Sequence, residues 1–448
     1  MKTKGILSSF VACLALVSAG SAQLRVGTWN VTNYSSGRVA DFQTALFASF
    51  NGRKFAPDVL IGQEFLSQTG VDNFLSLLNT AAGSPGDYAA STFIDGADTD
   101  SAFFYRTSKV QYLGTTIVAV GSSDPANQSR NTYRYDFRPI GFTAASTTVA
   151  CYSVHMKAGS TAEDQARRLV ESQRIRANAE TLPATWNFIM AGDTNIQSSS
   201  QAAYQTLVSS QVNNVGRFYD PISTPGDWNN HAEYRFVHTQ EPSTQMDDRF
   251  DFLLLCNALI DGLGLDYIGN PSIPYSTTTW NDPNHSYRCW GNDGTSFDVP
   301  IRTTTNTMVG PTIAQALINT VQSNGHLPVY LDMRVPGRVN STPALDFGIV
   351  RQGAVAQRTL NVSNVGDTQF WGTAGVANLV YTLTGNSKFS VPAGQFSVAP
   401  GANRNHTITL NTSTPGFFKG TISVNSDDPE QPVRLVQVQG KVFGSRGQ

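Results

Sequence analysis

The chain has 448 residues, of which 14% are charged, and its 31 basic and 33 acidic residues give a formal net charge of −2. This length exceeds the ~100–200 residues of an ordinary domain and predicts two domains. A near-neutral charge excludes the strongly basic surface that is typical of tight, sequence-independent DNA binding.

Residues 1–22 have the pattern of a secretory signal peptide. Lys2 and Lys4 precede an apolar stretch at 10–17 and small residues at 19–22, and such a segment is cleaved on export. Its loss would leave 29 basic and 33 acidic residues, a net charge of −4. No later stretch of the sequence approaches the ~20 apolar residues that span a bilayer. The sequence therefore predicts a secreted protein without a transmembrane segment.

Three cysteines follow the signal peptide: Cys151, Cys256 and Cys289. Export permits one disulfide, for which we consider Cys256 and Cys289, and an odd count leaves at least one thiol free. Cys151 and Cys256 lie in strand-like runs, which favours buried packing instead. The sequence leaves both alternatives open.

Residues 24–335 alternate short apolar runs with helical stretches and polar loops, which predicts a layered α/β domain. One helix is clear over 162–182, where apolar positions recur at helical spacing. From 340 to 445 the runs are short, alternate with a period of two and end in Gly, Pro, Asn or Asp, without a convincing helix. This part predicts a small immunoglobulin-like β-sandwich.

Six segments of the first domain share one layout, an apolar run that carries polar side chains at or near its end. Because strands of a packed sheet converge at their ends, these side chains can build one polar pocket. The segments are LRVGTWN with Asn30, PDVLIGQE with Glu64, CYSVHMKAG with His155 and Lys157, NFIMAGDTN with Asp193 and Asn195, RFDFLLL with Asp251, and GHLPVYLDM with His326.

The types of side chain in this set limit the classes of reaction that the pocket could catalyse. A few carboxylate and amide oxygens suit Mg²⁺, with Mn²⁺ as an alternative, completed by water and substrate phosphate. Histidine and lysine beside a hard cation can bind and protonate a phosphoryl group, and an aspartate can fix the tautomer of an imidazole. Together these groups predict phosphoester hydrolysis.

Each residue taken singly has a structural alternative. Asp193 could form an Asx-turn or cap a helix. His155 and His326 could be satisfied core histidines, and Asp251 could simply pair with Arg249. The functional prediction therefore depends on the ordered set.

In this order the six blocks resemble the endonuclease/exonuclease/phosphatase family, which includes pancreatic deoxyribonuclease and bacterial sphingomyelinases. The blocks extend from residue 28 to 329, and AFFYRTSKV at 102–110 is similar to a strand pair of that family. The resemblance implies a four-layer α/β/β/α sandwich, in which two β-sheets pack face to face and helices cover the outside.

The resemblance also implies roles. Glu64, as the main carboxylate ligand, and Asn30 would hold the divalent cation. Asp193 would position or deprotonate the attacking water, and Asn195 would donate a hydrogen bond to a phosphate oxygen.

The two histidines would complete the catalytic set. His326, oriented by Asp251, would contact the phosphate and act as acid or base. His155 would stabilise the transition state or protonate the leaving group, and Lys157 is a further candidate for substrate binding.

One position departs from the family pattern. The family usually has Asp directly before this histidine, whereas this chain has Asn324 and Gly325. Either one cation on Glu64 suffices, with Asn324 as a weaker ligand, or metal affinity has dropped and activity with it. We expect retained activity. If a ligand has been lost, Gly325→Asp should lower the Mg²⁺ concentration needed for half-maximal turnover.

Two segments of the second domain resemble immunoglobulin-like modules of the abnormal-spindle and hydin type. They are LDFGIVRQGAVAQRTLNVSNVGD at 345–367 and SVNSDDPEQPVRLVQVQGKV at 423–442. The resemblance implies adhesion, spacing or binding of a surface or another protein.

Three functions follow as hypotheses. The first is a secreted, Mg²⁺-dependent phosphodiester hydrolase acting on nucleic acid. The second is a sphingomyelinase-like phospholipase, although Tyr133, Tyr135 and Phe137 alternate with charges and form no clear membrane hairpin. The third is a catalytically silent surface-binding protein that acts through the β-sandwich.

The nucleic-acid hypothesis has one further candidate feature, a basic stripe that could track the phosphate backbone. Its residues are Arg134, Arg138, Lys157, Arg167 and Arg168.

Overall fold

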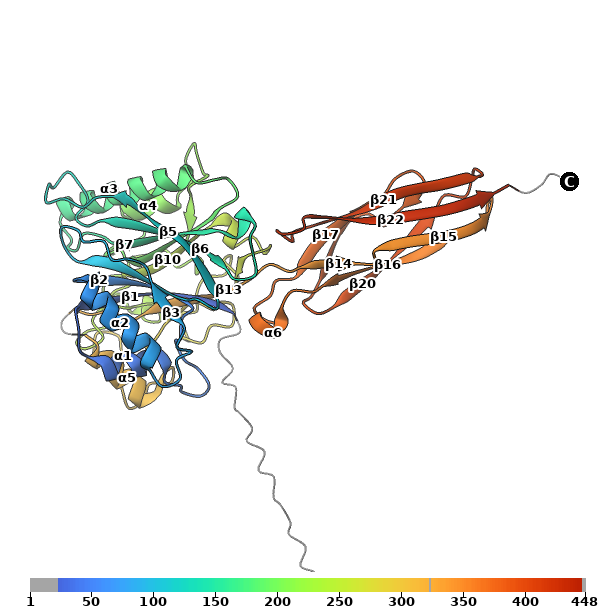
Figure 1. Cartoon of the computed structure of the whole chain (residues 1–448). Helices are drawn as coiled ribbons and strands as arrows, with labels where there is room; N and C mark the ends of the chain where they lie inside the picture. The colour runs from blue at the N-terminus through green and yellow to red at the C-terminus, as the bar shows by residue number, and fades with distance from the viewer. Residues whose placement is uncertain (1–22, 322–323, 445–448) are drawn as a thin grey trace, which may run out of the picture.

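The computed structural model describes residues 23–321 and 324–444, so the predicted signal peptide lies outside the described residues. Two β-sheets pack face to face in the first part of the chain, and helices cover both outer faces (Figure 1). This arrangement, the N-terminal sandwich, confirms the predicted four-layer α/β/β/α fold.

The first sheet has the strand order β11-β13-β1-β2-β4-β3, with β12 paired to β13. Its strands are β1 (Leu24–Tyr34), β2 (Val59–Phe65), β3 (Tyr88–Ala90), β4 (Asp100–Arg106), β11 (Asp266–Tyr267), β12 (Arg288–Cys289) and β13 (Val329–Arg334). Its outer face is covered by α1 (Val39–Phe47), α2 (Gln68–Thr80) and α5 (Gly310–Asn319). Burial of Phe42, Phe74 and Leu317 against this face fixes the three helices in place.

The second sheet has the order β5-β6-β7-β8-β10-β9. Its strands are β5 (Val110–Ala119), β6 (Thr132–Pro139), β7 (Val149–His155), β8 (Asn187–Asp193), β9 (Phe218–Tyr219) and β10 (Asp251–Cys256). It is covered by α3 (Ala162–Glu180), which confirms the helix predicted over 162–182, and by α4 (Ala202–Val208). A capping box of Thr161 and Asp164 starts α3. Short 3-10 turns lie at Ala145–Thr147, Ala232–Tyr234 and Asn257–Leu259.

The inner faces of the two sheets form the central core. Phe103 of β4 stacks on Tyr135 of β6, with ring centroids 4.9 Å apart. Ile61, Phe103, Tyr135 and Cys151 are all buried in this layer. A close-packed core of this kind holds the strand ends in fixed positions.

The C-terminal part of the chain, residues 339–443, forms a second sandwich of two sheets around its own apolar core (Figure 1). We call it the C-terminal sandwich. One sheet contains β14 (Val339–Ser341), β16 (Gln357–Asn364), β20 (Asn403–Leu410) and β18 (Phe389–Ser390), in that order. The other contains β15 (Ala344–Arg351), β22 (Val433–Phe443), β21 (Gly416–Ser426), β17 (Leu379–Thr384) and β19 (Gln395–Val398).

A single-turn helix, α6 (Thr368–Trp371), lies between β16 and β17, where the sequence predicts no helix. Asp367 caps it by accepting a hydrogen bond from the Phe370 amide, so a local cap creates a turn too short for periodicity to reveal. The predicted domain limits, 24–335 and 340–445, and the family of the second domain stay predictions.

The three cysteines in the described ranges are buried and free, so the Cys256–Cys289 disulfide is wrong. The two residues belong to different sheets, because Cys256 ends β10 and Cys289 ends β12. The Cys256 sulfur accepts from the Phe188 amide and the Cys289 thiol donates to the Val237 carbonyl. Among the helices of the described ranges, none has both the length and the apolar character needed to cross a bilayer.

Candidate active site

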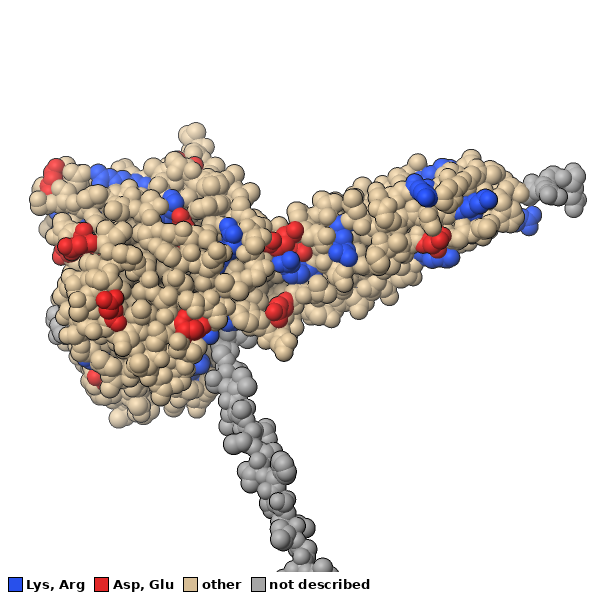
Figure 2. Space-filling view, in the orientation of Figure 1, with Lys and Arg blue, Asp and Glu red and all other residues tan. Residues whose placement is uncertain are grey.

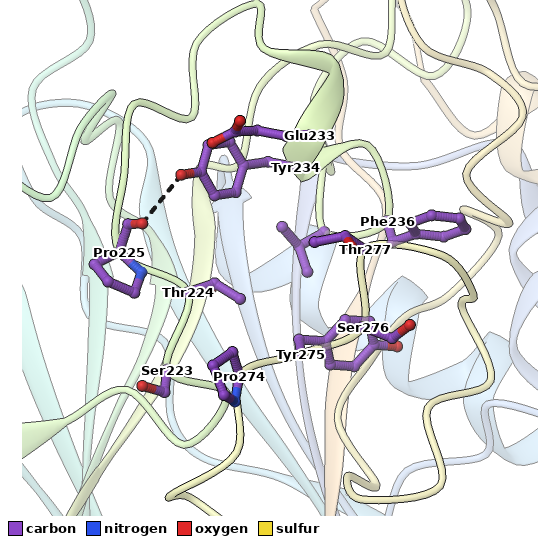
Figure 3. Close-up of a pocket in the computed structure, with 11 residues that line it drawn as sticks. Ser223, Thr224, Pro225, Glu233, Tyr234, Phe236, Pro274, Tyr275, Ser276 and Thr277 are labelled. Atoms are coloured by element: carbon purple, nitrogen blue, oxygen red, sulfur yellow. Dashed lines mark hydrogen bonds between the residues drawn. The ribbon is translucent and has the colours of Figure 1, made fainter.

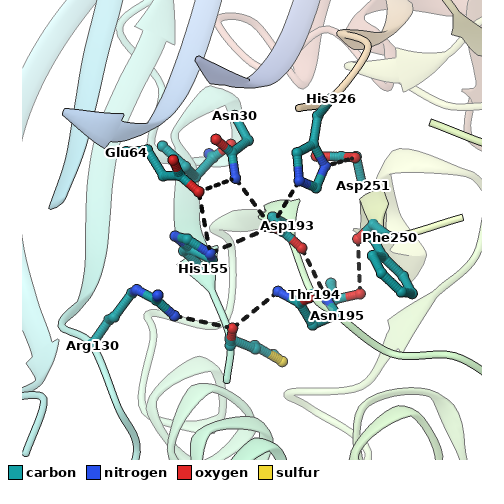
Figure 4. A network of polar contacts seen from close by, with 12 residues as sticks. Asn30, Glu64, Arg130, His155, Asp193, Thr194, Asn195, Phe250, Asp251 and His326 are labelled. Carbon is teal, nitrogen blue, oxygen red and sulfur yellow. Dashed lines mark hydrogen bonds and ion pairs between the residues drawn. The ribbon is translucent and has the colours of Figure 1, made fainter. Parts of the chain in front are cut away.

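Six predicted side chains meet in one polar network at the ends of strands from both sheets (Figure 4). Asn30 lies in β1 and Glu64 in β2, on the first sheet, and His326 lies three residues before β13. The second sheet contributes the last residues of β7 and β8 and the first of β10, which are His155, Asp193 and Asp251.

Strand register places three of these residues in one row. His155 of β7 is opposite Asp193 of β8 in the parallel pair, and Asp193 is opposite Asp251 in the antiparallel pair of β8 and β10. Directly opposed residues point to the same face of a sheet. The row therefore directs one imidazole and two carboxylates toward the first sheet.

Irregular backbone aims the residues of the first sheet. The register of β1 shifts after Asn30, and Thr32, Asn33 and Glu64 have positive φ angles of 55°, 47° and 65°. This turn directs the Asn33 amide to Glu64 Oε2 at 2.8 Å. Bulges and positive φ at non-glycine residues are costly and concentrate at functional sites.

Asp193 is the centre of the network. Its Oδ2 lies 3.1 Å from Asn30 Nδ2 and 3.4 Å from the Nε2 atoms of both His155 and His326. Its Oδ1 accepts a hydrogen bond from the Asn195 amide at 3.0 Å, which is the Asx-turn that the sequence analysis gave as the structural alternative. The same carboxylate thus forms the turn with one oxygen and the network with the other. Burial raises the pKa of Asp193 to about 6, and the charges of Asp251 and Glu64 add to this effect while His326 opposes it.

His326 is held from two sides. Its Nδ1 lies 2.8 Å from Asp251 Oδ2, and Trp29 Nε1 donates to its backbone carbonyl at 2.9 Å. Asp251 does not pair with Arg249, which binds Asp220 at 2.8 Å instead. The buried carboxylate therefore fixes the ring, with Nε2 toward the network.

The two histidines have opposite shifts in pKa. Burial alone would lower the pKa of His326, but Asp251, Asp193 and Glu64 outweigh it and raise the value to about 10. Burial lowers the pKa of His155 well below its usual value, and the charges of Arg130 and His326 add to this. At neutral pH, His326 is an imidazolium and His155 is neutral.

The remaining predicted residues lie beside the network. Asn195, whose φ is 51°, donates from Nδ2 to the Met156 carbonyl at 3.1 Å. Lys157 does not reach the network, because its ammonium pairs with Asp164 at 3.0 Å and donates to the Ala158 carbonyl.

The oxygen donors suit one hydrated divalent cation. Three carboxylates face a single imidazolium, and the Glu64 side chain is 16% exposed, against 2% for Asp193 and 0% for Asp251. Glu64 is therefore the carboxylate that a hydrated ion can reach. Asn30 Nδ2 donates to Glu64 Oε1 at 2.9 Å, and Asn30 Oδ1 accepts from the Thr32 amide at 3.1 Å. This amide oxygen is the second hard donor beside Glu64.

No cage of three or more His, Cys, Asp and Glu side chains is present within residues 23–321 and 324–444. Mg²⁺ does not require one, because it is commonly held by one or two carboxylates, water and substrate oxygens. The Glu64 carboxylate and the Asn30 amide oxygen are donors of the kind that Mg²⁺ accepts.

Close packing around position 325 accounts for the glycine there, because no side chain fits. A Cβ atom at this position would lie 2.1 Å from Val321 Cγ1 and 3.0 Å from Thr32 Oγ1. An Asp there would collide before its carboxylate could reach a cation. The packing of this loop therefore leaves no room for an aspartate at position 325.

Two residues that the sequence analysis missed support the network. Thr239 donates from Oγ1 to Asp251 Oδ2 at 2.6 Å, and Arg130 donates to the Met156 carbonyl at 3.4 Å, next to His155. Both lie in polar loops without any motif, so only their position in space identifies them.

The predicted basic stripe is wrong. Arg134 pairs with Asp136, and Arg138 binds Thr148. Arg167 and Arg168 are buried and donate to backbone carbonyls, which include Asn127 and Lys157. These side chains are structural and offer no continuous surface to a phosphate backbone.

A separate cavity of about 500 Å³ lies between the loops at 223–237 and 274–277 (Figure 3). Tyr234, Phe236 and Tyr275 line it, and the Tyr234 hydroxyl donates to the Pro225 carbonyl. No predicted site residue lines this cavity, so it is distinct from the polar network.

No protein-family model matches the chain, and no curated protein matches it. Among solved structures, D. rerio TDP2 humanized by 14 mutations is 15% identical, with a TM-score of 0.41, and the match covers 70% of this chain and 100% of that one. The catalytic domain of human Nocturnin with a bound sulfate anion is 13% identical, covering 70% and 94%, with a TM-score of 0.39. Beta toxin from Staphylococcus aureus is 13% identical, covering 69% and 99%, with a TM-score of 0.38. Likenesses this remote carry no argument about activity.

Proposed function

We propose that the protein is a secreted, Mg²⁺-dependent phosphodiester hydrolase that acts on nucleic acid. The observation that carries this proposal is one polar network of six side chains from both sheets, in which Asn30, His155 and His326 contact Asp193. This set combines a buried carboxylate, an imidazolium and a neutral imidazole with hard oxygen donors, as phosphoester hydrolysis requires. The resemblance of the six sequence blocks to the endonuclease/exonuclease/phosphatase family supports the same reaction.

Asp193 is suited to act as the base. Its raised pKa makes it a stronger proton acceptor than an exposed aspartate, and Asn30 and His326 orient its Oδ2 atom. It would position the attacking water and take its proton. Asn195, held by the Met156 carbonyl, would donate a hydrogen bond to a phosphate oxygen.

The histidines divide the remaining work. His326 keeps its charge through Asp251 and would bind the phosphoryl oxygens and donate a proton. His155 stays neutral and would donate a hydrogen bond from Nε2 to the transition state or leaving group. Environments that drive the pKa values of two groups apart are a common basis for distinct acid and base roles.

Glu64 and Asn30 would hold the Mg²⁺ ion, with Mn²⁺ as an alternative. When bound, the ion would neutralise charge that develops on the phosphoryl oxygens. The 16% exposed carboxylate of Glu64 gives solvent and substrate access to this position.

Nucleic acid is favoured over sphingomyelin as the substrate. Tyr133, Tyr135 and Phe137 are buried in the central core and cannot enter a bilayer. A lipid-cleaving enzyme needs apolar side chains beside its site to reach the headgroup, and the β6 rings do not supply them.

A panel of substrates tests the proposal. The chain without residues 1–22 is incubated with Mg²⁺ and plasmid DNA, RNA, sphingomyelin vesicles or bis(p-nitrophenyl) phosphate. We expect cleavage of nucleic acid that falls at least about 100-fold in His326→Ala, and not in His231→Ala, whose exposed ring pairs only with Asp227. Cleavage of sphingomyelin alone would establish the phospholipase, and no turnover of any substrate would favour the silent binding protein.

We propose further that the C-terminal sandwich attaches the enzyme to an anionic surface. Residues 344–444 carry seven basic and five acidic residues, whereas 23–343 carry 21 and 28, and Figure 2 shows mostly basic groups along its far half. Exposed Ile349 and Phe417 flank Lys441 across three strands, and Arg351 is opposite Phe443.

Chromatography on phosphocellulose, an anionic matrix, tests this attachment. Retention of the protein should fall in Lys441→Glu, because the substitution reverses a charge at the centre of this surface. Unchanged retention would contradict the proposal.

A further inference from the structure

A second cavity, of about 300 Å³, lies beside the polar network, and the proposed mechanism does not use it. Lys157 and Ala158, which follow His155 in the chain, form one wall. The residues that line the cavity include Arg130, Arg167, Asp98 and three serines, Ser122, Ser123 and Ser129. Its lining is therefore polar and contains three cationic side chains.

Arg130 connects this cavity to the catalytic residues (Figure 4). Its Nη1 donates to the Met156 carbonyl at 3.4 Å, and Asn195 Nδ2 donates to the same carbonyl at 3.1 Å. Met156 directly follows His155. The Met156 carbonyl thus links the Arg130 guanidinium to the Asn195 amide, and it belongs to the residue next to His155.

The guanidinium has bonding capacity left. Its Nε is buried without a partner, and so is the Ser129 hydroxyl. Its one ion pair is to Asp98, at 3.0 Å, and the Asp98 side chain is 48% exposed. An ion pair with so exposed a partner is weak, so an incoming anion can replace the carboxylate.

The other two cations have different tasks. Arg167 is buried and donates to the Ser122 and Asn127 carbonyls, which holds the loop that forms the far wall. Lys157 pairs with Asp164 outside the cavity lining. Lys157 is therefore already neutralised, and within the lining the guanidinium groups of Arg130 and Arg167 face one carboxylate, that of Asp98.

We propose that this cavity binds a second phosphate group of the substrate, with Arg130 as the specificity-determining residue. The proposal rests on the proposed function, because it assumes that a first phosphate lies at Asp193 and His326. Arg130 offers planar, paired donors that match phosphate oxygens, and the cavity would select polyphosphorylated substrates such as nucleic acid. A phosphocholine headgroup carries a cation, which the same lining would repel.

Equilibrium binding tests the cavity without turnover. Thymidine 3′,5′-bisphosphate and the two thymidine monophosphates are titrated into the chain by calorimetry, in EDTA and at low ionic strength. We expect the bisphosphate to bind at least 10-fold more tightly than either monophosphate. Arg130→Gln should reduce this ratio to about 1, and Asp98→Asn should increase it severalfold, because the competing carboxylate is gone. The tighter of the two monophosphates shows which end of the nucleoside occupies the catalytic network.

Two controls keep the outcomes distinct. Arg138→Gln, at the opposite end of β6, should leave the ratio unchanged, and an unaltered thermal transition shows that Arg130→Gln is folded. Equal binding of bisphosphate and monophosphates, or a ratio that Arg130→Gln does not change, would overturn the proposal. A preserved ratio in a chain that hydrolyses no phosphodiester would instead refute the proposed function and leave the cavity assignment intact.

Discussion

At the scale of single residues, the two active-site histidines differ in their neighbours. His326 Nδ1 faces a buried carboxylate, whereas His155 Nδ1 is buried without a partner. The same imidazole therefore becomes a cation at one position and a neutral hydrogen-bond donor at the other. Neither state follows from the motif alone, because each depends on residues that are distant in the sequence.

This difference predicts a pH dependence of stability. The pKa of His326 is about 10 in the folded state and about 6.5 in an unfolded chain. The stabilisation from its charge is fully present below pH 6.5 and is lost as the pH rises to about 10. In EDTA, the free energy of unfolding of the wild type should fall between pH 7 and pH 9 relative to that of His326→Gln, by up to about 1.4 kcal/mol per pH unit. Urea titrations with parallel pH profiles for the two proteins would contradict the raised pKa.

For Gly325→Asp, the structure predicts a loss of stability in place of the gain in Mg²⁺ affinity that the sequence predicted. Because a Cβ would lie 2.1 Å from Val321 Cγ1, Gly325→Asp should lower the free energy of unfolding by about 1–3 kcal/mol. Val321→Gly in the same chain should recover most of this loss. The test is urea denaturation of the two single variants and the double variant. A stable Gly325→Asp protein with a lower Mg²⁺ requirement would show that the loop has room for an aspartate at this position.

Most residues of the polar network could be predicted from the sequence, but the residues that support them could not. Strand-end motifs predict Asn30, Glu64, Asp193 and His326, because short apolar runs deliver them directly to the sheet ends. Thr239 and Arg130 come from polar loops whose path is set by tertiary packing, so no local pattern identifies them. The failed basic stripe has the same cause, since charge spacing on α3 does not show that Arg167 and Arg168 are buried.

At the scale of elements, strand register decides the geometry of the site. His155, Asp193 and Asp251 form one row only while β7, β8 and β10 keep their pairing. A shift of one residue would turn the side chains of a strand to the opposite face. Gly192, directly before Asp193, has a φ of +140°, and a Cβ there would lie 2.1 Å from the Val154 carbonyl oxygen of β7.

Gly192→Ala should therefore damage the site through the sheet. We expect a loss of more than about 3 kcal/mol in unfolding free energy, because the new methyl group meets backbone and the positive φ is strained. Gly141→Ala is the matched control, since Gly141 has a φ of +90° with open space around it, and should lose only about 1 kcal/mol. Chemical denaturation compares the two, and equal losses would mean that the contact with β7 is unimportant.

Helices and strands could be predicted where a sequence pattern extends over many consecutive residues. The helix predicted over 162–182 has apolar residues at helical spacing and a capping box, and the structure starts α3 at the predicted residue. The two-residue strands β9, β11 and β12 and the single turn of α6 have no such pattern. They exist because neighbouring strands and Asp367 satisfy their backbone groups.

At the scale of the whole molecule, the C-terminal sandwich extends away from the N-terminal sandwich (Figure 1). β13 starts three residues after His326 and rises about 20 Å to Arg334, and Val335 then pairs with Val376. Trp371 is buried beneath Lys109, whose ammonium lies 4.1 Å from its ring. The C-terminal sandwich thus contacts the N-terminal sandwich at the end of β13 that is distant from His326.

Loss of this contact should change shape and leave chemistry intact. Trp371→Ala removes a buried anchor at the junction, so the radius of gyration from small-angle X-ray scattering should increase, while the kcat/KM for bis(p-nitrophenyl) phosphate stays at the wild-type value. Phe417→Ala, at an exposed site on the C-terminal sandwich, should change neither quantity. An unchanged radius in Trp371→Ala would show that the other junction contacts suffice, and a fall in kcat/KM would show that the site depends on the junction.

The central claim is that Asp193 is the base at the centre of a phosphodiesterase site. The most direct measurement is the kcat/KM for bis(p-nitrophenyl) phosphate with Mg²⁺ in the wild type and in Asp193→Asn, which keeps the shape of the side chain but removes its charge. We predict a decrease of at least about 1,000-fold with an unchanged thermal transition. Equal rates in the two proteins would contradict the account.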